Sequence, residues 1–371
     1  MLDGRAPGYY NSIVQYGGTN ARRILGRRGG SMQVTGEKKR GVWARLLFWY
    51  KNARPVSLPQ SLLPALAAYV LAAGEDGFAP WTGLLAVLGA ELAHLSLNLF
   101  DDYFDYKKQA SGFRVDLVKK GERARTAKCA YITSGEATLS ELLAVCLGFG
   151  GAAALCGFLV FLTAGWPIIW PAALGLLLGI EYSGEPLRLS YRGFGELTIG
   201  VIFGPLLVCG VYLAAGGAYF WRALALGLAL GLLVTNIVYT HSVLDIKADT
   251  FTGKRTLAAL LQTPKYQLAG TAAFSFLPYL LVGLAVLAWE LSPCWLLTWL
   301  TLPWAVALYG SVRQFLHQPG VRPQRLFWYG PMGDWPAYCA AGLDWFLLRW
   351  FLARNLLSAF AVLCLLAGLL S

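Results

Sequence analysis

Long apolar stretches, separated by short polar or basic segments, dominate the chain from residue 57 onward. A helix needs about 20 mostly apolar residues to cross the hydrocarbon core of a bilayer. Scanned for such runs, the sequence predicts nine membrane-spanning helices, near residues 57–73, 82–100, 139–163, 167–182, 197–215, 222–243, 268–289, 294–312 and 351–370. We therefore expect an all-α, polytopic membrane protein, with a basic tail and interfacial segment at 1–52 and a nine-helix domain at 53–371.

The composition excludes a soluble fold. Hydrophobic residues make up 57% of the 371 positions, and only 14% are charged. Soluble domains carry about a quarter charged residues, so this chain has too few polar side chains to cover a surface that faces water. The lipid bilayer is its expected surroundings.

The charge indicates an orientation. The chain has 31 Lys and Arg against 20 Asp and Glu, an excess that in a soluble protein would suggest nucleic acid. If nine spans alternate, however, 30 of the 31 basic residues fall on one side and only Arg222 falls on the other. Basic residues favour the cytoplasmic side of a membrane. We expect a multi-pass protein of the inner (cell) membrane with a cytoplasmic N-terminus, an external C-terminus and no nucleic-acid partner.

Acidic residues gather where the second predicted span ends. Asn98, Asp102 and Asp105 lie at i, i+4 and i+7, which places them on one face of a helix. Glu91 lies seven residues before Asn98, on the same stripe. Ionisable residues in or beside a membrane span are costly and are functional candidates by default.

A second acidic cluster lies where the sixth predicted span ends, on the same side of the membrane. His241, Asp245 and Asp249 are spaced at i, i+4 and i+8. Like charges one turn apart destabilise a helix unless a positive charge lies between them. Mg²⁺ suits such oxygen ligands, and it commonly shares one or two carboxylates with the phosphate oxygens of a substrate.

Basic side chains follow both clusters. The loop after the first cluster contains Lys107, Lys108, Arg114, Lys119 and Lys120. Lys254 and Arg255 follow the second cluster. Because carboxylates, a divalent cation and basic groups together suit a diphosphate, we expect a diphosphate site that opens to the cytoplasmic side. The alternative is a transporter or cation pathway, since intramembrane carboxylates also mark ion paths.

The two clusters resemble the signature motifs of the UbiA superfamily of intramembrane prenyltransferases. The first motif corresponds to Asn98, Asp102 and Asp105, and the second to Asp245 and Asp249. The resemblance extends over residues 54–370. Four shorter stretches resemble the branch that prenylates 1,4-dihydroxy-2-naphthoate in menaquinone synthesis, namely residues 53–59, 182–187, 191–196 and 253–258.

The resemblance implies nine helices around a central cavity and a prenyl transfer reaction. In that interpretation an isoprenyl diphosphate binds through Mg²⁺, ionises, and alkylates an aromatic acceptor. The implied metal-binding and catalytic residues are Asn98, Asp102, Asp105, Asp245 and Asp249. The implied diphosphate-binding residues are Lys107, Lys108, Arg188, Lys254 and Arg255. Tyr182 is the implied aromatic contact near the allylic cation.

Three residues of the second motif depart from the family pattern. His241, Ser242 and Leu244 stand where the family usually has Asn, Asn and Arg. His241 is either a structural histidine or a residue close to the metal or the acceptor. In the first motif, Asp101 points about 100° away from Asp102 on a helix, so it is either a secondary ligand or a solvated neighbour.

Overall fold

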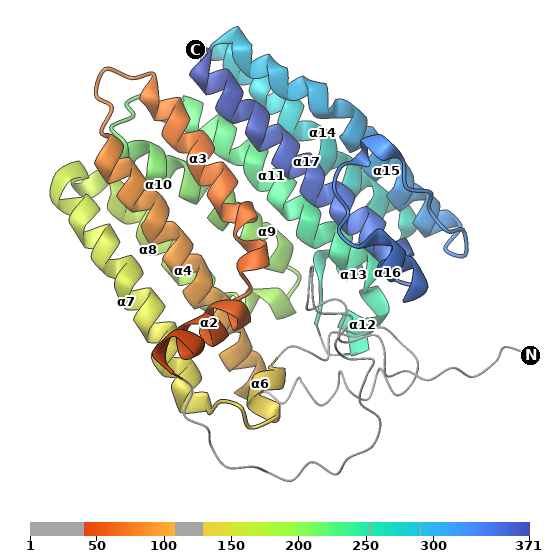
Figure 1. The fold of residues 1–371 in the computed structure, drawn as a ribbon. Coiled ribbons are helices and arrows are strands. Elements are labelled where there is room, and N and C mark those ends of the chain that lie inside the picture. Colours follow the sequence, from red (N-terminus) through yellow and green to blue (C-terminus); the bar gives the residue numbers. More distant parts are fainter. Residues whose placement is uncertain (1–40, 108–128, 252–253, 290) are drawn as a thin grey trace, which may run out of the picture.

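The computed structural model describes residues 41–107, 129–251, 254–289 and 291–371, and these form helices joined by loops (Figure 1). The described residues do not include most of the predicted basic tail. They also do not include the segment 108–128, which contains the predicted site residue Lys108. Within the described part, β-structure is limited to one isolated parallel bridge between Arg192 and Arg255.

Seven helices in the described part are long and apolar enough to cross a membrane, and each coincides with a predicted span. They are α4 (Pro80–Lys107), α7 (Leu139–Ala164), the composite helix Gly195–Ala214, α11 (Phe220–Leu244), α14 (Pro264–Ala288), the composite helix Pro293–His317 and α17 (Asp344–Leu369). The first and fourth predicted spans are shorter apolar helices, α3 (Pro59–Ala73) and the segment Trp166–Glu181, which ends in α8 (Ile169–Glu181).

Short helices connect the long ones. They are α2 (Val42–Asn52), η3 (Pro55–Ser57), α6 (Ala130–Thr133), η4 (Trp166–Ile168), η5 (Leu189–Tyr191), α12 (Ile246–Phe251), α13 (Leu257–Leu260), η8 (Phe327–Tyr329) and α16 (Trp335–Ala340). Helix α2 coincides with the predicted interfacial segment. It exposes Val42, Trp43 and Leu46 and buries Trp49, which is the pattern of a helix lying at a membrane surface.

The fifth span is kinked in its middle. It consists of α9 (Gly195–Val201), the π-helical turn η6 (Ile202–Leu206) and α10 (Leu207–Ala214). Gly204 has φ −98° and ψ −107°, and Pro205 follows it. Since proline supplies no backbone N–H and clashes with the preceding turn, the helix bends at this point. The composite Pro293–His317 helix similarly joins η7 (Pro293–Thr301) to α15 (Leu302–His317).

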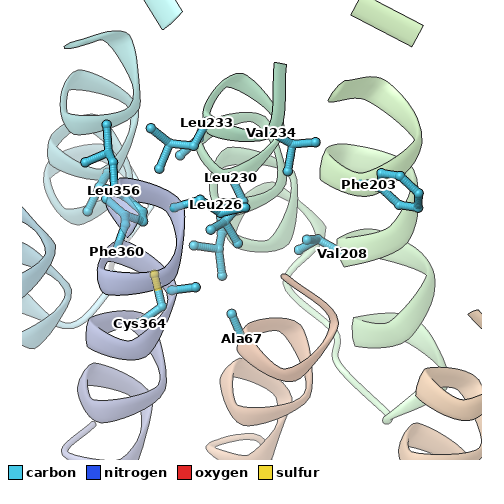
Figure 2. Packing of buried hydrophobic residues seen from close by; sticks show 14 of the residues in the cluster. Ala67, Phe203, Val208, Leu226, Leu230, Leu233, Val234, Leu356, Phe360 and Cys364 are labelled. Carbon is cyan, nitrogen blue, oxygen red and sulfur yellow. The ribbon is translucent and has the colours of Figure 1, made fainter. Parts of the chain in front are cut away.

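Helix α11 lies at the centre of the bundle. It is buried along most of its length and packs against α17, α14 and the fifth span. Leu226, Leu230 and Leu233 of α11 meet Leu356 and Phe360 of α17 (Figure 2). A helix that is apolar on all sides and buried by its neighbours is expected at the core of a membrane bundle.

Both acidic helix ends lie at the same end of the bundle. The end of α4 lies near α2 and α6, and the end of α11 leads into α12, all in the lower part of Figure 1. The C-terminus of the chain lies at the opposite end (Figure 1). The fold therefore places the two predicted motifs on one face, as their matching span directions required.

Candidate active site

The first motif lies on the last turns of α4. Asp102 and Asp105 are buried, with exposed fractions of 3% and 1%. The side-chain amide of Asn98 donates to the Ala53 carbonyl and to the Ser57 hydroxyl, both at 3.0 Å. Because both amide hydrogens are used, its oxygen Oδ1 is the atom that can face a cation.

Arg54 neutralises part of this motif. Its Nη2 lies 3.4 Å from Asp101 Oδ2 and 3.3 Å from Asp102 Oδ1, and it donates to the Asn98 carbonyl. Burial alone would lower the pKa of the Arg54 guanidinium, but the charges of Asp102 and Asp101 outweigh burial and raise that pKa. Arg54 therefore stays charged and bridges the start of the chain's membrane domain to α4.

The solvated interpretation of Asp101 is wrong. Besides its ion pair with Arg54, its Oδ1 accepts a hydrogen bond from the Ser183 hydroxyl at 2.6 Å. The helix turns Asp101 away from the face of Asp102, as expected, but it turns it toward the loop after α8 and not toward water. Asp101 thus ties α4 to the chain segment that follows Tyr182.

Asp102 retains one oxygen for a ligand. Its Oδ2 accepts a hydrogen bond from the Tyr131 hydroxyl at 3.1 Å. Its Oδ1 is buried and forms no hydrogen bond within the described residues, although the Arg54 charge lies near. Burial and the neighbouring Asp102 carboxylate raise the pKa of Tyr131, so the phenol keeps its proton.

Tyr191 joins the first motif to the basic residues. Its hydroxyl donates to Asp105 Oδ1 at 2.8 Å. The Arg188 guanidinium lies 4.4 Å from the centre of its ring, and the Lys254 ammonium lies 5.2 Å from it. The structure therefore gathers three predicted site residues, Asp105, Arg188 and Lys254, around one tyrosine.

The second motif joins this group through the backbone. The Lys254 N–H donates to the Asp249 carbonyl at 2.9 Å. Asp249 belongs to α12, and Asp245 lies between α11 and α12. An unbroken series of contacts therefore leads from Asp105 through Tyr191 and Lys254 to Asp249.

Glu196 holds the two loops of the site together. Its carboxylate accepts hydrogen bonds from the Leu257 N–H at 3.0 and 3.2 Å, at the start of α13. An isolated parallel β-bridge between Arg192 and Arg255 provides a second backbone link between the same two segments. The loop after α8 and the loop after the second motif are thus fixed to each other, which orients Arg188 and Lys254 together.

His241 contacts its own motif. Its Nδ1 lies 3.6 Å from Asp245 Oδ2, and its ring meets Phe346 edge to face at 5.1 Å between ring centres. His241 thus lies beside Asp245, a predicted metal ligand, and also packs on α17. Its contacts agree in part with a structural histidine and in part with a residue close to the metal.

The other predicted residues lie at the margin of this group. Tyr182 directly follows α8, is half-buried, and lies within electrostatic range of Asp101, Glu196 and Asp105. Lys107 is exposed at the end of α4, with its ammonium 5.3 Å from the Tyr103 ring. Arg255 is exposed, and it is linked to this group through the β-bridge between its backbone and that of Arg192.

The arrangement suits a cation that is shared with a substrate. Among the described residues, no group of three or more His, Cys, Asp or Glu side chains converges closely enough to enclose a metal ion. Mg²⁺, however, is usually held by one or two carboxylates together with substrate phosphates and water. Asp102 Oδ1, which is buried without a hydrogen bond, is a donor atom that such an ion would satisfy.

Sequence reasoning did not identify three residues that organise the site. Tyr191 lies within the 191–196 stretch and Arg54 within the 53–59 stretch. Both stretches resemble the family, so the sequence offered a reason to consider these two residues. Nothing in the sequence pointed to Tyr131. It lies 29 positions from Asp102, and its hydroxyl reaches the Asp102 carboxylate only when α6 folds back onto α4.

Comparison with known proteins identifies the fold and the family. The family model described as the UbiA prenyltransferase family matches residues 61–332, well over half of the chain. The chain belongs to the UbiA prenyltransferase family. The match includes both acidic motifs and the loop that carries Tyr191.

The curated relatives of the UbiA chain include enzymes that act on naphthoates. The 1,4-dihydroxy-2-naphthoate octaprenyltransferase of Mycobacterium tuberculosis is 30% identical over 249 residues, which cover 64% of this chain and 81% of the relative. The 2-carboxy-1,4-naphthoquinone phytyltransferase of Synechocystis is 25% identical, covering 73% of this chain and 84% of the relative.

Solved structures share the fold. A UbiA homolog from Archaeoglobus fulgidus, bound to GPP and Mg²⁺, matches with a TM-score of 0.55 and 13% identity, covering 85% of this chain and 99% of that one. A UbiA homolog from Aeropyrum pernix matches with a TM-score of 0.55 and 19% identity, covering 85% and 98%. The chain is therefore an all-α, multi-pass membrane protein with the UbiA fold.

Proposed function

We propose that this protein transfers an isoprenyl chain from an isoprenyl diphosphate to an aromatic acceptor, with Mg²⁺ as the cofactor, in quinone biosynthesis of the menaquinone type. The observation that carries the proposal is the series of contacts from Asp105 through Tyr191 and Lys254 to Asp249. It joins two acidic helix ends to basic side chains on one face of a membrane bundle.

The residues for Mg²⁺ are Asn98, Asp102, Asp105, Asp245 and Asp249. When bound, the ion neutralises the diphosphate and favours its departure. Arg188 and Lys254, which flank Tyr191, complement the remaining charge of the leaving group. Lys107 and Arg255 provide further positive charge at the cytoplasmic mouth. The sequence assigns Lys108 the same role, and this residue lies outside the described residues.

The allylic carbon reacts on the membrane side of this charged region. The C–O bond to the diphosphate breaks, and its electron pair leaves with the diphosphate. A carbon atom of the electron-rich aromatic ring forms the new C–C bond, and the same ring carbon then loses its proton, or carbon dioxide where it carries a carboxylate. Tyr182, beside the acidic residues, stabilises positive charge through its ring. The apolar helices around the site exclude water, which would otherwise capture the cation.

The proposed acceptor is a dihydroxynaphthoate. It is the acceptor named for the Mycobacterium tuberculosis relative, and the stretches at 182–187 and 191–196 resemble that branch. We further propose that the protein lies in the cell membrane with its N-terminus and active site on the cytoplasmic side, because the basic residues segregate there.

Labelled transfer tests the proposal. Membranes containing the protein should transfer radiolabelled isoprenyl groups from the diphosphate to 1,4-dihydroxy-2-naphthoate, and EDTA should abolish the transfer until Mg²⁺ is restored. Asp102→Ala and Asp249→Ala should each reduce the rate at least about 100-fold, because each removes a charged ligand of the transition state. Asp76→Ala, which alters an exposed acid between α3 and α4, is the matched control and should retain the wild-type rate.

Two results would contradict the proposal. Full activity in Asp102→Ala and Asp249→Ala would refute the site. Mg²⁺ or proton flux through reconstituted vesicles, without any prenyl transfer, would instead favour the transporter alternative.

A further inference from the structure

Glu91 is a buried acid that the proposed reaction has not used. It lies in the middle of α4 and is half-buried. Neither of its carboxyl oxygens touches solvent or accepts a hydrogen bond within the described residues. An acidic side chain at this depth of a membrane helix is costly unless it has a partner, so a group that the chain itself does not supply is expected there.

The surroundings of Glu91 are polar and ordered. The buried His94 pairs through Nδ1 with the Ser61 hydroxyl at 2.7 Å and through Nε2 with the Ser57 hydroxyl at 3.2 Å. Ser61 lies close to Glu91, but its hydroxyl donates to the Leu58 carbonyl at 3.0 Å. The neighbouring polar groups are therefore already engaged with one another and leave the Glu91 carboxyl available.

This polar group is connected to the first acidic motif. The Ser57 hydroxyl, which pairs with His94, also accepts the hydrogen bond from the Asn98 amide at 3.0 Å. The His94 ring packs on Phe203 of the kinked span, with 4.4 Å between ring centres. Glu91, His94 and Asn98 thus lie along one wall built from η3, α3, α4 and η6.

The position of Glu91 suits the acceptor and not the diphosphate. Glu91 and Asn98 lie on one face of α4, separated by seven residues, or about 10 Å along the helix axis. An aromatic ring that binds beside α4 between Glu91 and Asn98 would present one edge to the allylic carbon near Asn98 and the other edge to Glu91. An anionic diphosphate, in contrast, would be repelled by a carboxylate.

We propose that the Glu91 carboxyl group accepts a hydrogen bond from a ring hydroxyl of the aromatic acceptor, and that Ser57, His94 and Ser61 hold the wall on which the acceptor lies. A carboxylate that accepts this bond increases the electron density of the ring, which favours attack on the allylic cation. The inference rests on the proposed prenyl transfer and assigns the acceptor subsite within it.

Steady-state kinetics with a series of acceptors test the assignment. Glu91→Gln should lower kcat/KM for 1,4-dihydroxy-2-naphthoate about 10- to 100-fold, the range expected for a hydrogen bond to a charged group. The Kd of geranyl diphosphate with Mg²⁺ should change less than about twofold. Glu75→Gln is the matched control. Glu75 is likewise a partly buried glutamate, but its carboxylate accepts a hydrogen bond from the Tyr212 hydroxyl, and it lies between α3 and α4 at the other end of the bundle.

Acceptors that lack one hydroxyl separate a direct contact from a structural role. One of the two analogues 1-hydroxy-2-naphthoate and 4-hydroxy-2-naphthoate lacks the hydroxyl that Glu91 binds. For that analogue the wild-type protein should lose activity and Glu91→Gln should cause no further loss, because the bond is already absent, whereas for the other analogue Glu91→Gln should lower kcat/KM as it does for 1,4-dihydroxy-2-naphthoate. Equal losses with all three acceptors, or a parallel loss of geranyl diphosphate binding, would overturn the assignment.

Two further measurements distinguish a misfolded variant, and a failure of the proposed function, from a failure of the acceptor assignment. If Glu91→Gln does not fold, as judged by thermal unfolding in detergent, Glu91→Asp takes its place in the same acceptor series and the same criteria apply. If the wild-type protein transfers no prenyl group to any of the three acceptors, the proposed function itself fails, and the subsite falls with it.

Discussion

Tyr191 shows how one side chain organises an active site at the residue scale. Its hydroxyl binds a buried carboxylate, and its ring packs beneath two cations from different loops. The phenol is suited to this position because it has a hydrogen-bond donor at one end and an electron-rich face that attracts cations. Phenylalanine would keep the second property and lose the first.

Tyr191→Phe separates these two contributions. The variant should fold normally but lower kcat/KM for the prenyl diphosphate about 10- to 100-fold, because Asp105 loses a hydrogen bond worth about 1.5–3 kcal/mol. Tyr279→Phe is the control, since it removes a hydroxyl of α14 that is hydrogen-bonded at 2.8 Å to Thr301, the last residue of η7. A kinetic effect equal in the two variants would mean that Tyr191 has no specific role in the site.

Asp101 and Arg54 illustrate a second point at this scale. Three acids within five positions of α4 repel one another, and the chain itself supplies part of the compensation. Arg54 reaches Asp101 and Asp102, whereas Tyr191 reaches Asp105. The acids are thus pre-positioned before any metal ion arrives, which reduces the cost of assembling the site.

At the scale of elements, the kinked fifth span depends on close approach to α11. Gly200 and Gly204 face Gly227 and Gly231, and each pair is spaced four residues apart. A Cβ atom added at Gly231 would lie 2.5 Å from the Gly200 carbonyl oxygen and 3.0 Å from the Gly204 Cα. Small residues at this spacing let two membrane helices approach closely.

Gly231→Ala should therefore destabilise the protein. The added methyl group meets backbone atoms that cannot rotate away, so we expect a loss of about 1–3 kcal/mol. Thermal unfolding in detergent would show this loss as a lower Tm. Gly148→Ala on α7 is the control, because nothing lies within 4 Å of its added Cβ, and its Tm should be unchanged or slightly higher. Equal Tm values for Gly231→Ala and the wild type would refute the close packing.

At the scale of the whole molecule, charge distribution and helix direction agree. The two acidic helix ends lie at one end of the bundle and the C-terminus lies at the other (Figure 1). In the sequence, most basic residues fall in the N-terminal segment and in the two loops that follow the acidic motifs, whereas Arg222 lies at the start of α11. We expect the same excess of positive charge to orient the chain and to complement the proposed diphosphate site.

Protease accessibility tests this orientation. In sealed vesicles that expose the outer face, protease should remove an epitope tag placed after Ser371, while a tag placed before Met1 should survive until detergent is added. The reason is that nine crossings, the number that the sequence predicts, would put the two ends on opposite sides, with the basic loops inside. Simultaneous cleavage of both tags would require an even number of crossings and contradict nine.

The sequence by itself determined the bundle, its spans and the two acidic motifs. Hydrophobic runs and helical spacing are local properties, because the bilayer forces each apolar segment to satisfy its own backbone as a helix. For this reason seven of the predicted spans coincide with long apolar helices of the described part, whereas the first and the fourth are shorter apolar helices. The acidic residues of the first motif lie on α4 as expected, and Asp102 and Asp105 are both buried there. The matching family confirms the same interpretation.

Only the tertiary structure decided which distant side chains meet at the site. Arg54 reaches Asp101 across 47 positions, and Tyr191 reaches Asp105 across 86. Such contacts depend on how helices pack and on how loops fold back. Helix packing and loop conformation produce no regular spacing of residues along the chain, so the sequence pattern does not indicate these contacts. The sequence therefore left open whether Asp101 is solvated. Its contacts, the partners of Asp102 and the unpaired Glu91 carboxyl became visible only in the folded chain.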